Sequence, residues 1–183
     1  MSRIIIVSGS PTANSRLNGL IEYVEGIWKA EGLAVSHIRV ADLPAEALIR
    51  ADFRNPEIIA AAEQVAAADA VVLASPVYKA SYTGVLKTFL DLLPQTGLKD
   101  KIALPLFIGG TLAHLLAIDY SLNPLIHALG GRHVLGGVYA IDPWVERLEG
   151  GGYGLADELR QRLETAAVQL RDELAWRERR LNG

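Results

Sequence analysis

The chain has 183 residues, of which 50% are hydrophobic, with no cysteine and a formal net charge of -3. This length fits one domain, residues 1–183, that buries about 70% of the surface of its unfolded chain. The lack of cysteine excludes disulfide bonds, thiolate metal sites and a cysteine nucleophile, and the small net charge argues against nucleic acid as a partner. The apolar run after Arg3 is too short for a signal peptide, and no apolar stretch approaches the roughly 20 residues of a membrane span. We therefore expect a soluble cytoplasmic protein with no membrane partner.

Short runs rich in isoleucine and valine alternate along the chain with longer segments of helical periodicity. The apolar runs predict strands at Arg3–Ser8, Ala34–Val40, Ala70–Ser75, Ile102–Ile108 and His133–Ala140. The periodic segments predict helices at Ser15–Glu31, Pro56–Ala68, Gly84–Leu93, Thr111–Leu129 and Tyr153–Leu181, with a short irregular or helical excursion at Pro44–Arg54. This order indicates a three-layer α/β fold with a flavodoxin-like, doubly wound, five-stranded parallel sheet in the strand order 2-1-3-4-5.

Three unusual loops follow the first, third and fourth predicted strands, at residues 9–16, 76–83 and 109–114. In an open parallel sheet, ligands bind beyond the carboxyl ends of the strands, where the strand order reverses. The loops are far apart in sequence, but this topology brings them to the same edge of the sheet. We therefore expect them to form one ligand site together.

The first loop leads from a buried strand through a hydroxyl-rich turn into a helix, which is a favourable place for a phosphate. It matches neither the Gly-x-x-x-x-Gly-Lys-Ser/Thr loop of nucleoside triphosphate sites nor the Gly-x-Gly-x-x-Gly dinucleotide fingerprint. We predict a monophosphate cradle, with flavin mononucleotide (FMN) as the cofactor, formed by Ser10, Thr12, Ser15 and Arg16. The alternative is that the hydroxyls only form a turn and cap the helix.

The second loop is suited to hold a flat ring. Pro76 removes a backbone donor and stiffens the exit from the strand, so the backbone of Val77 and Tyr78 is expected to be rigid. A planar heterocycle can pair its rim with such backbone groups while its face packs on an aromatic side chain. Ordinary packing of Tyr78 and Tyr82 is the alternative.

The third loop repeats this logic with Gly109 and Gly110, since paired glycines let a ring approach the main chain. Thr111 is placed to cap the helix that follows. His114, in the first turn of that helix, is expected either to donate a hydrogen bond to the edge of a cofactor or to be a structural histidine.

The same predicted helix contains Pro124, which has no N–H to donate to the carbonyl of Tyr120 and whose ring clashes with that carbonyl. The helix must therefore kink or bulge around Tyr120. Bulges of one residue often occur at functional sites, whereas a plain proline kink, or two helices meeting here, is the structural alternative.

Six strings of residues together resemble the NAD(P)H-dependent FMN reductases of two-component alkanesulfonate monooxygenase systems. The resemblance runs from residue 3 to about residue 140 and rests on Gly9-Ser10-Pro11, Ser15-Arg16, Pro76-Val77-Tyr78-Lys79-Ala80, Gly84-x-Leu86-Lys87-Thr88-x-Leu90-Asp91-Leu92-Leu93-Pro94, Gly109-Gly110-Thr111-x-Ala113-His114-Leu115-Leu116-Ala117 and Asp119-Tyr120-x-Leu122-x-Pro124. The resemblance implies a homo-oligomer, commonly a tetramer, that reduces FMN with NADPH, or with NADH, and releases it to a separate flavin-dependent monooxygenase in sulfur assimilation. Hydride passes from nicotinamide C4 to flavin N5, so no protein side chain is expected to act as an acid or base.

Carried onto this chain, the resemblance also implies roles for individual residues. Ser10, Ser15 and Arg16 hold the flavin phosphate, and the isoalloxazine is lined by Pro76, Val77, Tyr78, Gly110 and Thr111. Tyr120 corresponds to a residue inserted in its helix, which produces a bulge at a subunit interface and controls how the flavin is held. The chain departs from the family at Thr12, where an arginine often stands, and at the glycine-rich segment Asp142–Gly152, which we expect to be mobile.

Two other functions fit the same fold. An NAD(P)H:quinone or azo reductase would keep its FMN tightly bound, and a flavodoxin-like electron carrier would use it for electron transfer only. The carrier is disfavoured because such proteins steer their partners with a strong charge field, and the net charge here is only -3. A receiver domain is excluded because Ser8-Gly9-Ser10 and Ser75-Pro76 stand where it needs acidic residues.

Overall fold

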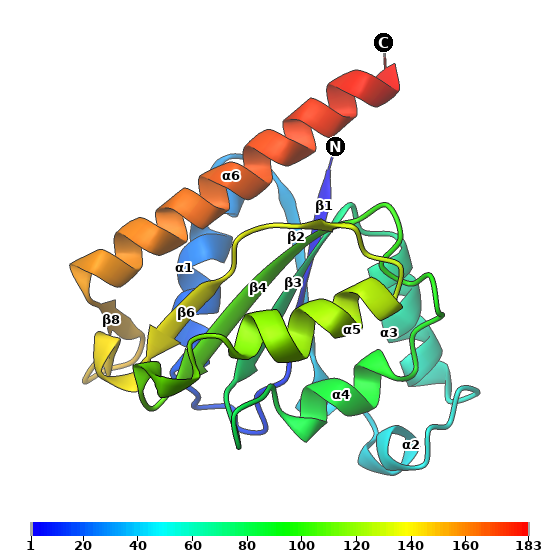
Figure 1. Ribbon diagram of the computed structural model, residues 1–183, viewed down its shortest axis with the longest axis horizontal. Coiled ribbons are helices and arrows are strands. Elements are labelled where there is room, and N and C mark those ends of the chain that lie inside the picture. Colours follow the sequence, from blue (N-terminus) through cyan, green and yellow to red (C-terminus); the bar gives the residue numbers. More distant parts are fainter. Residues whose placement is uncertain (1, 183) are drawn as a thin grey trace.

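The computed structural model describes residues 2–182, which form a parallel sheet covered by helices on both faces (Figure 1). In spatial order the strands are β2 (Ala34–Arg39), β1 (Arg3–Ser8), β3 (Ala70–Pro76), β4 (Ile102–Gly109) and, sharing the last position, β5 (His133–Val134) and β6 (Val138–Ile141). Every pairing in this sheet is parallel. The flavodoxin-like α/β fold and its strand order are therefore confirmed.

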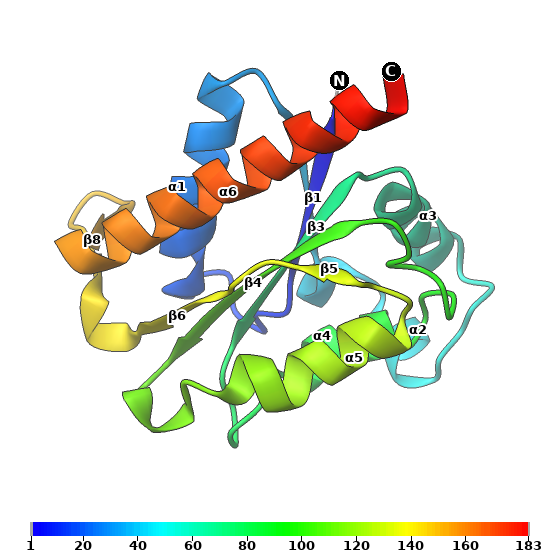
Figure 2. The same ribbon diagram turned by 45° about the horizontal axis from the view of Figure 1, so that its top comes forward.

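The helices lie in two layers, and Figures 1 and 2 show the sheet between them. One layer consists of α1 (Leu17–Ala30) and the long α6 (Asp157–Asn182). The other consists of α3 (Pro56–Ala66), α4 (Gly84–Leu90) and α5 (Asn123–Ala128), with the short α2 (Ala45–Ile49) beside α4. No helix within residues 2–182 has the length and apolarity needed to cross a membrane.

Alternation along β1 explains why the sheet needs both layers. Ile4 and Ile6 point into the core under α1 and α6, while Ile5 and Val7 point into the core under the other helices, and all four are buried. Because both faces of β1 are covered, its sequence is a continuous run of apolar residues. Trp28 of α1 is fully buried, and its indole N–H donates to a carbonyl of α6 at 3.0 Å, which joins the two helices of one layer.

The fifth strand differs from the prediction, because the run His133–Ala140 is divided into β5 and β6. β5 pairs with β4 up to Ala103, and β6 pairs with β4 from Leu106 onward. Between these points, the two β4 residues 104 and 105 lie opposite the three residues 135–137. Pro105 of β4 lies at this point and has no N–H for a neighbouring strand. A Cβ on Gly137 would lie 2.9 Å from Pro105 Cβ, so a glycine at position 137 allows the fifth strand to lie close to β4 at this point.

Two predicted helices also differ. The segment Thr111–Leu129 is not one helix but a 3-10 turn at Leu112–His114, a π-helical turn at Ile118–Leu122, and then α5. Residues 153–155, predicted to start the last helix, form strand β8 (Tyr153–Leu155), which pairs antiparallel with β7 (Val145–Arg147). Three glycines with positive φ, at 150–152, make the turn between them, and the segment expected to be mobile thus folds into a hairpin.

Candidate functional site

The three predicted loops meet at the carboxyl edge of the sheet. The backbone N–H of Gly9 donates to Ala74 of β3 at 2.8 Å, and the Gly9 carbonyl accepts a hydrogen bond of 2.6 Å from the Thr83 hydroxyl. The N–H of Val77 donates to the carbonyl of Ile108 at 2.7 Å. The first and second loops are therefore linked by a hydrogen bond, and the second loop is joined to the end of β4, where the third loop begins.

In the predicted phosphate loop, residues 9–16, side-chain hydroxyls form hydrogen bonds with the backbone of the loop itself and of the helix that follows. The buried Ser10 hydroxyl donates to the Thr12 carbonyl at 3.0 Å and accepts from the Thr12 N–H at 3.3 Å. The Ser15 hydroxyl accepts from the N–H of Leu17, the first residue of α1, at 3.2 Å. These bonds form the turn of the alternative to a phosphate site, whereas the N-cap residue of α1, Arg16, makes no side-chain cap hydrogen bond.

The loop nevertheless remains open to an anion. The backbone N–H groups of Ala13, Asn14 and Arg16 make no hydrogen bond within residues 2–182. They precede the 14-residue helix α1, whose amino-terminal end carries partial positive charge. The loop thus has the donors that a phosphate monoester needs, and Thr12 and Asn14 are exposed.

Arg16 also contacts a segment far along the chain, because its Nε donates to the carbonyl of Val145 in β7 at 2.9 Å. In return, Arg147 of β7 donates from Nε and Nη2 to the Asn14 carbonyl at 3.1 and 2.5 Å. The β7–β8 hairpin, residues 145–155, therefore adjoins the phosphate loop. Sequence reasoning missed Arg147, because no local pattern connects it with a loop more than a hundred residues earlier.

The second loop is a tight turn that presents Tyr78 to solvent. Tyr78 and Ser81 exchange two backbone hydrogen bonds, of 2.9 and 3.2 Å, around Lys79 and Ala80, which both have positive φ. The Tyr78 side chain is 54% exposed. Pro76 is buried at the end of β3 and Val77 is partly buried beside it, so only the tyrosine of these three predicted residues extends outward.

The third loop contains two glycines with different surroundings. A Cβ on Gly109 would lie 2.2 Å from the hydroxyl of Tyr139, which is buried and donates to the Thr111 carbonyl at 2.8 Å. Burial raises the pKa of the Tyr139 phenol, so the hydroxyl stays protonated as a donor. Gly110 is exposed and has no atom within 4 Å of its Cβ position, which leaves space for a ring. The Thr111 hydroxyl accepts from the N–H of Ala113, the predicted cap.

The bulge predicted around Tyr120 is confirmed as the π-helical turn Ile118–Leu122. Pro124 then falls in the first turn of α5, where its missing N–H is tolerated. The Tyr120 hydroxyl donates to the carbonyl of Ala80 at 2.9 Å, so the bulge contacts the second loop directly. This contact could not be inferred from the sequence, which predicted the bulge but not its neighbour.

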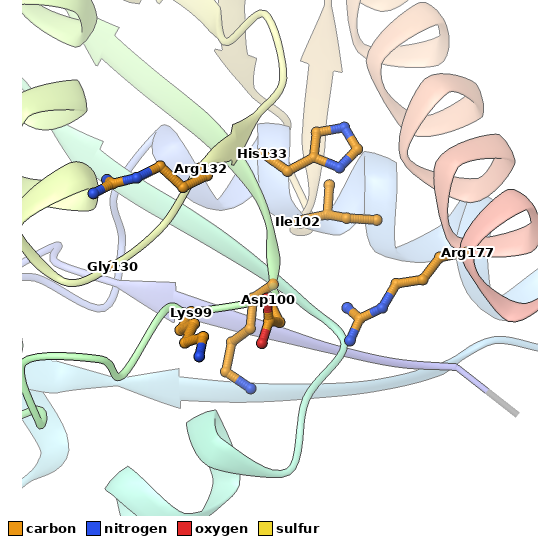
Figure 3. A pocket seen from close by; sticks show the side chains of 8 residues that line it. Lys99, Asp100, Ile102, Gly130, Arg132, His133 and Arg177 are labelled. Atoms are coloured by element: carbon orange, nitrogen blue, oxygen red, sulfur yellow. The ribbon is translucent and has the colours of Figure 1, made fainter. Parts of the chain in front are cut away.

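A basic hollow lies at the opposite, amino-terminal edge of β4 and β5 (Figure 3), lined by Lys99, Asp100, Lys101, Ile102, Gly130, Arg132, His133 and Arg177. Its cations are largely committed to backbone carbonyls. Lys101 Nζ donates to Ala66 and Ala68 at 2.8 and 2.7 Å, and Arg177, which reaches in from α6, donates to Asp69. Burial lowers the pKa of the Lys101 ammonium. These cations therefore bind the backbone carbonyls between the end of α3 and the start of β3. Among residues 2–182 there is no cluster of three metal-ligating side chains.

The parallel sheet in the order β2-β1-β3-β4-β5, with free backbone N–H groups before α1 and open space beside Gly110 at its carboxyl edge, defines a flavodoxin-like α/β domain. The family model of NADPH-dependent FMN reductases matches residues 2–146. The FMN reductase (NADPH) of Escherichia coli is 43% identical over 143 residues, which are 78% of this chain and 75% of that one. The chain therefore belongs to the NADPH-dependent FMN reductase family and is an oxidoreductase.

Two further relatives cover more of the chain. The FMN reductase (NADPH) of Pseudomonas putida is 40% identical over 172 residues, which are 91% of this chain and 87% of the relative. The solved apo form of an NADH:FMN oxidoreductase, EMOB, has a TM-score of 0.85 at 38% identity and covers 94% of this chain and 90% of its own. The family assignment thus extends over nearly the whole fold.

Proposed function

We propose that this protein reduces FMN with a nicotinamide nucleotide and releases the reduced flavin to a separate flavin-dependent monooxygenase of the alkanesulfonate type. Membership of the NADPH-dependent FMN reductase family supports the first part. The observation that carries the proposal is the open phosphate loop, whose free N–H groups precede α1 at the edge where three loops meet. The transfer to a monooxygenase rests on the resemblance of the loop sequences to those reductases.

The residues of the site have separate roles in this reaction. Bound FMN supplies the hydride acceptor, and the protein positions it. The phosphate is held by the N–H groups before α1 with Ser10, Ser15 and Arg16, while Thr12 adds a hydroxyl without charge. The flavin ring lies against Val77, Tyr78, Gly110 and Thr111, close to Pro76 at the end of β3. Gly109 forms the backbone beside it, which the Tyr139 side chain supports from the core. Catalysis therefore depends on stacking and orientation rather than on a proton donor.

Release of flavin during turnover requires weak binding. With association at about 10⁶ M⁻¹s⁻¹, a flavin held at ~1 nM leaves at roughly 10⁻³ s⁻¹, whereas one held at ~1 μM leaves at about 1 s⁻¹. The exposed loop residues and the exposed Tyr78 favour the weaker case, because they leave much of the flavin in contact with solvent. A retained flavin would instead indicate the quinone or azo reductase.

We also propose that the protein is a homo-oligomer, expected to be a tetramer, formed through the exposed apolar side chains beside the site. Leu112, Leu115, Leu116 and Tyr120 are each about half exposed, between 48% and 56%. Large apolar groups gathered at one end of a domain are typical of an interaction surface. We place the protein in the cytoplasm, since a chain with no cysteine suits a reducing compartment.

The test is to purify the protein, record its visible spectrum and measure NADPH and NADH oxidation with and without added FMN. We expect a largely colourless protein whose nucleotide oxidation depends on added FMN, and a mass in solution above that of one chain. Stoichiometric flavin that survives extensive dialysis would support the quinone reductase instead. Flavin that is bound but never reduced by either nucleotide would support the electron carrier.

A further inference from the structure

The β7–β8 hairpin and the phosphate loop are joined by two arginines that cross in opposite directions. Arg16 of the loop donates to the Val145 carbonyl of the hairpin, and Arg147 of the hairpin donates to the Asn14 carbonyl of the loop. More than 120 residues separate the partners of each pair, so this contact exists only in the folded chain. It brings a second guanidinium to the cradle.

The position of this hairpin does not depend on the arginines alone. Val145 is 1% exposed and belongs to the core between the sheet and α1. A Cβ on Gly19 of α1 would lie 2.9 Å from the Tyr153 side chain, so helix and hairpin pack in direct contact. Arg147 is thus held beside the loop by buried packing, while its own side chain is exposed to solvent.

The charge of a flavin phosphate favours a second cation beside Arg16. A phosphate monoester carries about -1.5 to -2 at neutral pH. Arg16 is the one cation in the phosphate loop, and its Nε is already used on Val145. Arg147 uses two of its N–H groups on Asn14, and its remaining N–H groups make no hydrogen bond within residues 2–182. A guanidinium with free donors is a strong partner for phosphate.

We propose that Arg147 is a second phosphate-binding arginine, which the hairpin brings to the flavin phosphate to complete the charge of the cradle. This inference rests on the proposed function, because it assumes that FMN occupies the loop. It assigns a binding role to a segment that lies outside the three loops of the carboxyl edge. It also makes the preference for FMN over riboflavin depend on the hairpin.

The experiment compares Arg147→Ala and Arg147→Lys with the wild type by fluorescence titration of FMN and of riboflavin. For Arg147→Ala we expect the FMN dissociation constant to rise roughly tenfold or more, because a charge-assisted hydrogen bond to phosphate is lost. The riboflavin constant should change less than about twofold, because riboflavin has no phosphate. Arg147→Lys, which keeps the charge, should recover part of the FMN affinity. Arg50→Ala, an exposed ion-paired arginine on the carboxyl side of α2, is the matched control.

Several outcomes would overturn this role. Equal losses of FMN and riboflavin affinity in both Arg147 variants would mean that the arginine only supports the loop. A rise of the KM for NADPH, with NADH and FMN unaffected, would assign Arg147 to the 2′-phosphate of the nucleotide. Unchanged FMN affinity in Arg147→Ala, with a wild type that binds and reduces FMN, would remove the proposal and leave the proposed function intact. A wild type that neither binds nor reduces FMN would refute both.

Discussion

Gly109 and Gly110 are adjacent, yet the structure predicts opposite effects when each is replaced by alanine. In Gly109→Ala the new Cβ would lie 2.2 Å from the Tyr139 hydroxyl and 3.1 Å from its ring carbon Cζ, so the buried ring has to move. Overpacking of this kind destabilises by about 1–3 kcal/mol. Loss of the hydrogen bond from Tyr139 to the Thr111 carbonyl adds about 0.5–1.5 kcal/mol. We expect the free energy of unfolding to fall by about 1.5–4.5 kcal/mol, the sum of these two terms.

Gly110→Ala is the matched control, because its Cβ would point into open space. Its stability should stay within about 0.5 kcal/mol of the wild type, as for most surface substitutions, while FMN affinity falls because the methyl group enters the space left for the ring. Urea denaturation of both variants measures the stabilities, and fluorescence titration measures the affinities.

The double variant Gly109→Ala with Tyr139→Phe tests the cause. Removing the hydroxyl relieves the closest contact, so the double variant should be more stable than the sum of the two single effects predicts. Equal stability of Gly109→Ala and Gly110→Ala, or strict additivity in this cycle, would refute the conclusion that the Tyr139 hydroxyl leaves no room for a side chain at position 109.

Three further variants test other parts of the structure. Arg16→Ala should weaken FMN binding by roughly 1.5–3 kcal/mol and riboflavin binding much less, and equal losses in flavin titrations would show that Arg16 does not contact the phosphate. Deletion of Tyr120 should let the π-helical turn become regular, and because the bulge contacts the second loop, this should tighten flavin binding and alter the oligomer. Unchanged flavin affinity and unchanged mass in solution would show that Tyr120 is only a packed aromatic side chain. Lys101→Ala should lower the free energy of unfolding by about 1–3 kcal/mol, because two carbonyls lose their donor. Lys99→Ala changes an exposed lysine nearby and should be close to neutral. Similar urea midpoints for both variants would contradict the stabilising role of Lys101.

Much of the architecture could be predicted from the sequence, because local patterns carry it. Buried parallel strands are apolar runs whatever their neighbours are, so Arg3–Ser8 was predicted to the residue and the strand order followed from the alternation of elements. The missing N–H of Pro124 is a covalent property, and it predicts a kink or a bulge around Tyr120, of which the structure shows the bulge. The carboxyl-edge rule for parallel sheets likewise predicts from the sequence that the three loops meet.

Tertiary packing alone decided the remaining features, since they depend on residues that meet only after folding. The fifth strand divides because Gly137 passes close to Pro105, and neither residue signals this by itself. Arg147 reaches the phosphate loop only because the hairpin packs on α1, and Tyr120 reaches Ala80 only because two loops meet at one edge. Hydrophobic periodicity records which face of an element is buried, but not which distant side chain lies opposite it.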